Sequence, residues 1–139
     1  MVFVERSPRS LVAIRQNLSR LALVERARVV RGDVPAVLRR MARGAERFDV
    51  ALLDPPYEGG DLLRALTALV EAGVLADRAA VVVESAKRHP LPPVAGLVVE
   101  DERIYGETVV TRLCPDAERS GGGADEAPVA LAGDEQHGN

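Results

Sequence analysis

The sequence predicts an α/β domain with a mainly parallel β-sheet that ends in an antiparallel hairpin. Up to residue 83, short runs rich in Val, Leu and Ala alternate with segments whose apolar residues recur at helical spacing. The runs at 2–4, 48–53 and 79–83 are almost entirely apolar, as in strands that helices cover on both faces. Two strand-like stretches then occupy residues 97–113 with no helix between them, which indicates the hairpin.

The helices between these strands are marked by their ends as well as by their period. Ser7 is a preferred N-cap residue, and Pro8 suits the first turn because its missing N–H costs nothing there. After a short strand at 28–31, apolar residues at helical spacing predict a second helix near 37–41 and a third at 62–70.

The 139 residues suit a single domain. Hydrophobic residues make up 47% of the chain and aromatic residues only 3%, so the core is expected to be aliphatic. Residues 1–115 carry the regular pattern and form the predicted domain. Residues 116–139 are rich in Gly, Ala and acids without periodicity, which predicts a disordered tail.

The net charge of −3 hides an uneven distribution. From residue 116 onward there are six acids and one base, so the preceding domain is slightly positive. Only Lys87 among the 18 basic residues is a lysine. Arginine forks suit phosphates and base edges, although a GC-rich genome explains the same bias along the whole chain.

Other classes of protein are disfavoured. The single cysteine, Cys114, allows no internal disulfide, and there is neither a signal sequence nor a membrane-spanning apolar run. We therefore expect a cytoplasmic protein. Cys114, His89 and His137 show no metal-ligand spacing, so we expect no metal site.

In open α/β sheets, ligands bind beyond the carboxyl ends of the strands. The candidate residues are therefore those that follow each apolar run, namely Glu5, Asp33, Asp54, Pro55, Pro56, Tyr57 and residues 84–87.

The most specific motif is Asp54-Pro55-Pro56-Tyr57, directly after a predicted strand. The carboxylate of Asp54 and the carbonyl of Pro55 can both accept N–H bonds from an amine conjugated to a ring, which turns its lone pair toward an electrophile. Pro56 keeps the loop from closing into a helix, and Tyr57 offers a face on which an extruded base can stack. The alternative is an ordinary proline-rich turn.

Two further acids suit a nucleotide. Glu5 ends a strand just before a helix, where a carboxylate can accept from both ribose hydroxyls. Asp33 could accept from the amine of adenine while the backbone N–H of Val34 donates to the ring. A solvated glutamate and a helix-capping aspartate remain the alternatives.

Residues after the last predicted parallel strand are candidate RNA contacts. Ser85, Lys87, Arg88 and His89 could bind phosphates near a target base, and a solvated loop is the alternative.

A set of short motifs between about residues 2 and 113 carries a family resemblance. In order, they are Phe3-Val4-Glu5-Arg6, Arg31-Gly32-Asp33, Phe48-Asp49-Val50, Leu53-Asp54-Pro55-Pro56-Tyr57, Val82-Val83-Glu84 and Arg103-Ile104-Tyr105-Gly106-Glu107-Thr108. Together they resemble the RsmD family, which methylates a guanine N2 in 16S ribosomal RNA.

The resemblance implies a Rossmann-like, S-adenosylmethionine-dependent methyltransferase acting on 16S ribosomal RNA or the assembling small subunit. The cofactor would be bound by Glu5, Arg6, Asp33 and Val34. The target amine would be held by Asp54 and Pro55, with Pro56 shaping the loop and Tyr57 stacking on the base.

The chain departs from the family in one large respect. Family members have an earlier strand and a Gly-rich turn that cradles the methionine end of the cofactor, and the sequence shows neither before Glu5. That first strand would lie between the strands ending at Glu5 and Asp54, so we expect a gap with two exposed edges. Either a truncated gene product or a start codon assigned too late would explain it. The alternatives are a DNA adenine or cytosine amino-methyltransferase and a non-catalytic remnant.

Overall fold

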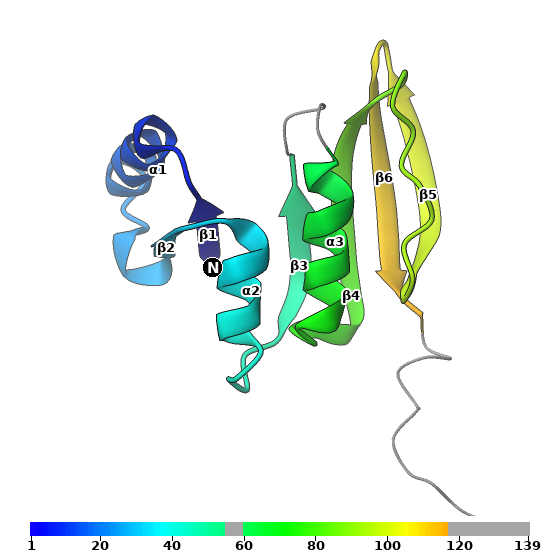
Figure 1. Cartoon of the computed structure of the whole chain (residues 1–139). Helices are drawn as coiled ribbons and strands as arrows, with labels where there is room; N and C mark the ends of the chain where they lie inside the picture. The colour runs from blue at the N-terminus through cyan, green and yellow to red at the C-terminus, as the bar shows by residue number, and fades with distance from the viewer. Residues whose placement is uncertain (55–59, 117–139) are drawn as a thin grey trace, which may run out of the picture.

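The computed structural model describes residues 1–54 and 60–116 (Figure 1). In chain order, the elements of this part are β1 (Val2–Glu5), α1 (Pro8–Arg20), the short 3-10 helix η1 (Val24–Arg26), β2 (Arg28–Arg31), α2 (Val34–Met41), β3 (Phe48–Leu53), α3 (Asp61–Glu71), β4 (Leu75–Ala86), β5 (Leu97–Tyr105) and β6 (Thr108–Pro115). The predicted alternation of strands and helices is confirmed. The predicted disordered tail lies outside the described residues, apart from Asp116.

The strands form two separate sheets. One contains β1 and β2 in parallel, and the other has the order β3-β4-β6-β5. Strand β3 is parallel to β4, whereas β6 is antiparallel to both β4 and β5. The β5–β6 pair is the predicted C-terminal hairpin, and its turn contains Gly106 at φ 62°. The α/β fold with an antiparallel end is therefore confirmed.

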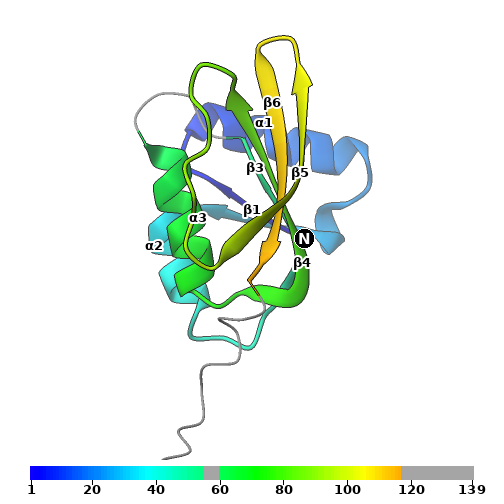
Figure 2. The same ribbon diagram turned by 90° about the vertical axis from the view of Figure 1, so that its right-hand side faces the viewer.

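A gap separates the two sheets at the predicted place. Within the described residues, β1 pairs only with β2 and β3 pairs only with β4. Helices α2 and α3 nevertheless pack side by side across this interruption, while α1 lies on the opposite side of the sheets (Figures 1 and 2). The two parts are thus joined mainly through their helices and not through strand hydrogen bonds.

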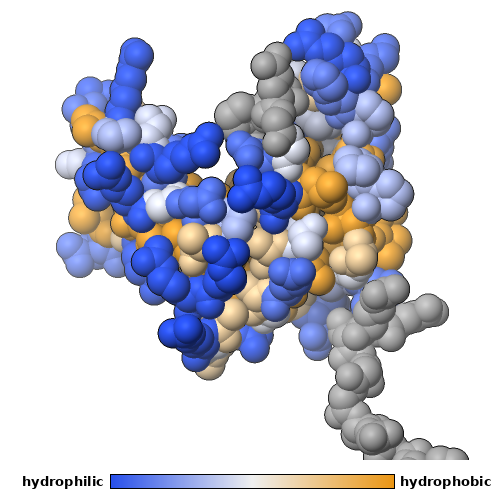
Figure 3. Space-filling view, viewed as in Figure 1, coloured by the Kyte–Doolittle hydropathy of each residue, from blue (hydrophilic) through white to orange (hydrophobic). Residues whose placement is uncertain are grey.

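The core lies between α3 and the four-stranded sheet. Leu66 of α3 is fully buried, as are Val81 and Val83 of β4, and Leu113 of β6 is 2% exposed. In the space-filling view, hydrophobic side chains gather beside α3 on the side of the hairpin, and hydrophilic ones surround the part with β1 and β2 (Figure 3). The core is aliphatic, as the composition predicted.

The expectation that helices cover both faces of every strand is wrong for β3. Val50 is 57% exposed and Leu52 is 77% exposed, whereas Ala51 and Leu53 pack against the core. Alternate residues of a strand point to opposite faces. Helix α3 covers the face of Ala51 and Leu53, and no described helix covers the other.

Strand β4 is longer than the predicted run at 79–83. It extends to Ala86, so Glu84 and Ser85 belong to the strand and not to the loop after it. Antiparallel pairing with β6 causes this extension, because Glu84 faces Val110 and Ser85 faces Val109 in the ladder. Among the helices of the described part, none is long and apolar enough to span a membrane.

Candidate functional site

The candidate site residues gather at one edge of the two sheets. The arrowheads of β1 and β3 point the same way (Figure 1), and β2 is parallel to β1. Glu5 ends β1, Asp33 follows β2, and Asp54 follows β3. The structure therefore brings three of the predicted acids to the carboxyl edge, where ligands of open α/β sheets bind.

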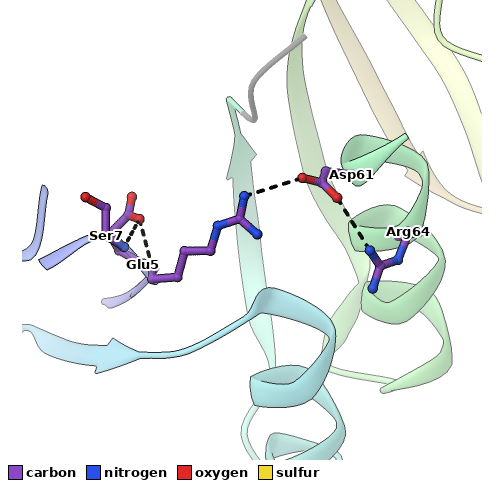
Figure 4. Close-up of polar contacts among 5 residues, drawn as sticks. Glu5, Ser7, Asp61 and Arg64 are labelled. Atoms are coloured by element: carbon purple, nitrogen blue, oxygen red, sulfur yellow. Dashed lines mark hydrogen bonds and ion pairs between the residues drawn. The ribbon is translucent and has the colours of Figure 1, made fainter. Parts of the chain in front are cut away.

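The side chain of Glu5 is held by the backbone that follows it. Its Oε1 accepts the N–H of Arg6 at 2.8 Å and that of Ser7 at 2.7 Å (Figure 4). Ser7 also caps α1, because its Oγ accepts the N–H of Ser10. Both bonds to Glu5 use the same carboxylate oxygen, and the residue is half-buried. The carboxylate is thus oriented before any ligand arrives.

Asp33 occupies the N-cap position of α2, where a capping role was the alternative. Its side chain makes no hydrogen bond to the helix, so the carboxylate is not used as a cap. The backbone carbonyl of Asp33 instead accepts the N–H of Val37 at 3.0 Å. The N–H of Val34 has no acceptor within the helix, because the first N–H groups of a helix have no carbonyl four residues earlier. This edge thus offers an acceptor and a donor side by side.

A close approach of the chain explains the glycine before Asp33. A Cβ built on Gly32 would lie 2.8 Å from Cγ2 of Val37, so a larger residue would force the loop and α2 apart. Glycine at position 32 therefore allows the loop before Asp33 to lie close to α2.

Asp54 directly follows Leu53, which pairs with Val83 of the neighbouring strand. Its side chain is exposed. Pro55, Pro56 and Tyr57 lie outside the described residues. Gly60, with a φ of 70°, immediately precedes α3, which begins at Asp61.

The predicted phosphate contacts beyond β4 divide into two groups. Ser85 is 4% exposed, and its hydroxyl has no hydrogen-bond partner within the described residues. A side chain buried in the ladder cannot reach a phosphate from solution, so its prediction as an RNA contact is wrong. Lys87, Arg88 and His89 are exposed, and the backbone N–H of Lys87 donates to the carbonyl of Glu107 in the hairpin turn.

Sequence reasoning missed a charged cluster at this edge. Asp61 lies 3.7 Å from Arg6 and 3.5 Å from Arg64, with a different carboxylate oxygen facing each guanidinium (Figure 4). The pair of Asp61 and Arg64 could have been found from its helical spacing. The contact with Arg6 could not, because it depends on how the two sheets are placed.

No metal centre emerges from the described ranges. No group of three or more His, Cys, Asp or Glu residues in residues 1–54 and 60–116 could hold a metal ion.

The parallel strands, the acids at their carboxyl ends and the terminal antiparallel hairpin define the fold of S-adenosylmethionine-dependent methyltransferases. Residues 1–113 match the family described as "Conserved hypothetical protein 95", and the chain belongs to this family. The match confirms the family resemblance that the motifs indicated.

Individual relatives agree with this assignment. "Putative rRNA methyltransferase YlbH" of Bacillus subtilis is 32% identical over 110 residues, which are 78% of this chain and 60% of that protein. A solved structure described as "Putative methyltransferase yhhF" from Escherichia coli is 26% identical with a TM-score of 0.70, over 84% of this chain and 63% of that one. This chain thus spans less than two thirds of either relative.

A more distant neighbour shows the fold alone. It is the methyltransferase PaMTH1 of Podospora anserina, solved with S-adenosylhomocysteine bound. This neighbour is 12% identical with a TM-score of 0.63, and the match covers 83% of this chain and 60% of that one.

Proposed function

We propose that this chain contributes to S-adenosylmethionine-dependent methylation of the exocyclic N2 amine of a guanine in 16S ribosomal RNA. The observation that carries the proposal is the arrangement of Glu5, Asp33 and Asp54 at one edge, each at the end of a parallel strand. The family supports methyl transfer, and the name of the Bacillus subtilis relative supports an RNA substrate.

The cofactor fits the described residues through its nucleoside. The carboxylate of Glu5 would accept from the ribose hydroxyls, while Asp33 and the N–H of Val34 would contact adenine. The side chain of Arg6 points toward α3. We therefore propose that Arg6 contributes to cofactor binding through its backbone N–H, which orients the carboxylate of Glu5. When bound, S-adenosylmethionine supplies an electrophilic methyl group.

Asp54 would act on the other reactant. The lone pair of a guanine amine is delocalised into the ring, which makes it a poor nucleophile. A carboxylate that accepts one of its N–H bonds favours a pyramidal nitrogen and directs the lone pair to the methyl group. The carbonyl of Pro55 would accept the second N–H, and Tyr57 would stack on the base.

One observation favours a second candidate, a non-catalytic remnant. The gap between β1 and β3 lies where the family has its first strand, and the described residues offer no Gly-rich cradle for the methionine end. A remnant of this kind would keep an RNA contact and transfer no methyl group.

The experiment is a transfer assay with tritiated S-adenosylmethionine. It compares naked 16S RNA, small ribosomal subunits and duplex DNA as acceptors, for the 139-residue chain and for the chain preceded by the residues encoded in frame upstream of Met1. We expect transfer to 16S RNA in the second case. Transfer only to DNA would favour a DNA amine instead, and no transfer to any acceptor would favour the remnant. A ribosomal substrate would also place the reaction in the cytoplasm.

A further inference from the structure

The cluster of Arg6, Asp61 and Arg64 has no part in the amine chemistry proposed for Asp54. Arg6 follows β1, whereas Asp61 and Arg64 belong to the first turn of α3, so the cluster connects the two parts of the molecule (Figure 4). The guanidinium of Arg6 lies 3.7 Å from one oxygen of Asp61, and that of Arg64 lies 3.5 Å from the other.

Both contacts are long and exposed, so they contribute little to the stability of the fold. The side chain of Arg6 is 67% exposed and that of Arg64 is 65% exposed, whereas that of Asp61 is 34% exposed. Exposed ion pairs at such distances stabilise a fold very little. One carboxylate also neutralises only one of the two guanidinium charges, so the cluster presents a net positive charge to solvent.

We propose that Arg6 and Arg64 together bind a backbone phosphate of the RNA substrate. Asp61 lies within ion-pair distance of both guanidinium groups, and the phosphate would replace it as their partner. Each guanidinium carries five N–H donors in a planar fork that matches the oxygens of a phosphate. A carboxylate that makes one long contact with each fork leaves most of those donors to an incoming anion.

The place of the cluster in the fold identifies which phosphate it would meet. Arg6 immediately follows Glu5, and Asp61 comes seven positions after Asp54. The cluster therefore lies on the carboxyl edge that carries both the cofactor acids and the amine-binding acid. We therefore expect a phosphate bound there to belong to the nucleotide whose base reaches Asp54, or to an adjacent nucleotide. This inference rests on the proposed function for its RNA substrate.

The test is fluorescence anisotropy with a labelled single-stranded fragment of 16S RNA, without cofactor, over a series of salt concentrations. Arg6→Gln and Arg64→Gln should each weaken binding about threefold to tenfold and reduce the slope of log K against log salt by about 0.7, as for one lost contact to a single strand. Asp61→Asn should tighten binding, because it removes the carboxylate that competes with the phosphate.

The matched control is Arg43→Gln. This exposed arginine lies between α2 and β3, at the opposite edge of the sheet. The substitution removes the same charge as Arg6→Gln and Arg64→Gln do. It should bind RNA as the original chain does. Thermal denaturation of every variant checks that the fold is kept.

Two results would overturn the inference. The first is unchanged binding by both arginine variants, including the case in which the original chain binds no RNA. The second is weaker binding by Asp61→Asn, since the cluster would then serve the fold. Tighter binding of duplex DNA than of the RNA fragment in the same assay would overturn the choice of RNA as the partner. Methyl transfer is measured separately. If the arginine variants weaken RNA binding as expected but no methyl group is transferred, the result counts only against the proposed function.

Discussion

The backbone N–H of Gly32 donates a hydrogen bond to the carbonyl of Glu5 at 3.0 Å, which ties the ends of β1 and β2 together. Neighbouring strands lie about 4.8 Å apart. The bond therefore places Glu5 and Asp33 at adjacent strand ends, at a separation that one nucleoside can bridge. The proposed recognition of the cofactor depends on this arrangement.

Replacing Glu5 with Gln should weaken binding of S-adenosylhomocysteine by about tenfold or more, because a charged acceptor forms stronger hydrogen bonds than a neutral amide. Saturation-transfer NMR with the nucleoside protons reports this directly. Glu25→Gln, in the exposed helix η1, removes the same charge and is the control. Equal binding of S-adenosylhomocysteine by the two variants would show that Glu5 does not bind the cofactor.

Gly32→Ala should lower the free energy of unfolding by about 1–3 kcal/mol, because the added Cβ would lie 2.8 Å from Cγ2 of Val37. Urea denaturation measures the change. Gly44→Ala is the matched control, since its nearest contact would be 3.4 Å from the carbonyl oxygen of Met41. If both variants lose the same free energy of unfolding, close packing against α2 does not explain why residue 32 is a glycine.

Leu52→Lys should leave the stability nearly unchanged and should oppose pairing of β3 between chains. The side chain is 77% exposed on β3, which has no partner on its outer edge within the described residues. Charged side chains on such edges oppose pairing between chains. Sedimentation velocity over a range of concentrations is the measurement, and Thr67→Lys on the exposed side of α3 is the control. A loss of stability as large as that of a core substitution would show that Leu52 is covered.

The 139-residue chain alone should bind S-adenosylmethionine weakly, because the residues proposed to hold the cofactor would contact only its nucleoside. Titration calorimetry should give little heat at micromolar protein concentrations. Tight binding would show that the methionine end of the cofactor is held by this chain after all.

Periodicity and end signals were enough to predict most elements of this fold. Ser7 correctly indicated the start of α1, and the apolar run at 48–53 correctly predicted β3. The start of β4 at Leu75 was missed because Asp77 and Arg78 interrupt its apolar pattern, although Leu75 pairs with Phe48 of β3. Its end at Ala86 was missed because it depends on pairing with β6.

The candidate site was predictable only in part. Acids that end parallel strands could be found from the sequence, since the fold class fixes which edge they share. The burial of Ser85 and the contact of Arg6 with Asp61 depend on packing between distant segments. Neither has a local sequence signal.

We propose that Asp54 directs methylation of a guanine amine in 16S RNA. The most direct measurement is mass spectrometry of nucleosides from 16S RNA, after incubation with S-adenosylmethionine and the chain, tested both alone and preceded by any residues encoded in frame upstream of Met1. N2-methylguanosine should appear, and Asp54→Ala should reduce its rate of formation about 100-fold or more. Asp49→Ala, at the other end of β3 and also exposed, should leave the rate unchanged. Equal formation with Asp54→Ala, or a methyl group on another base, would contradict the claim.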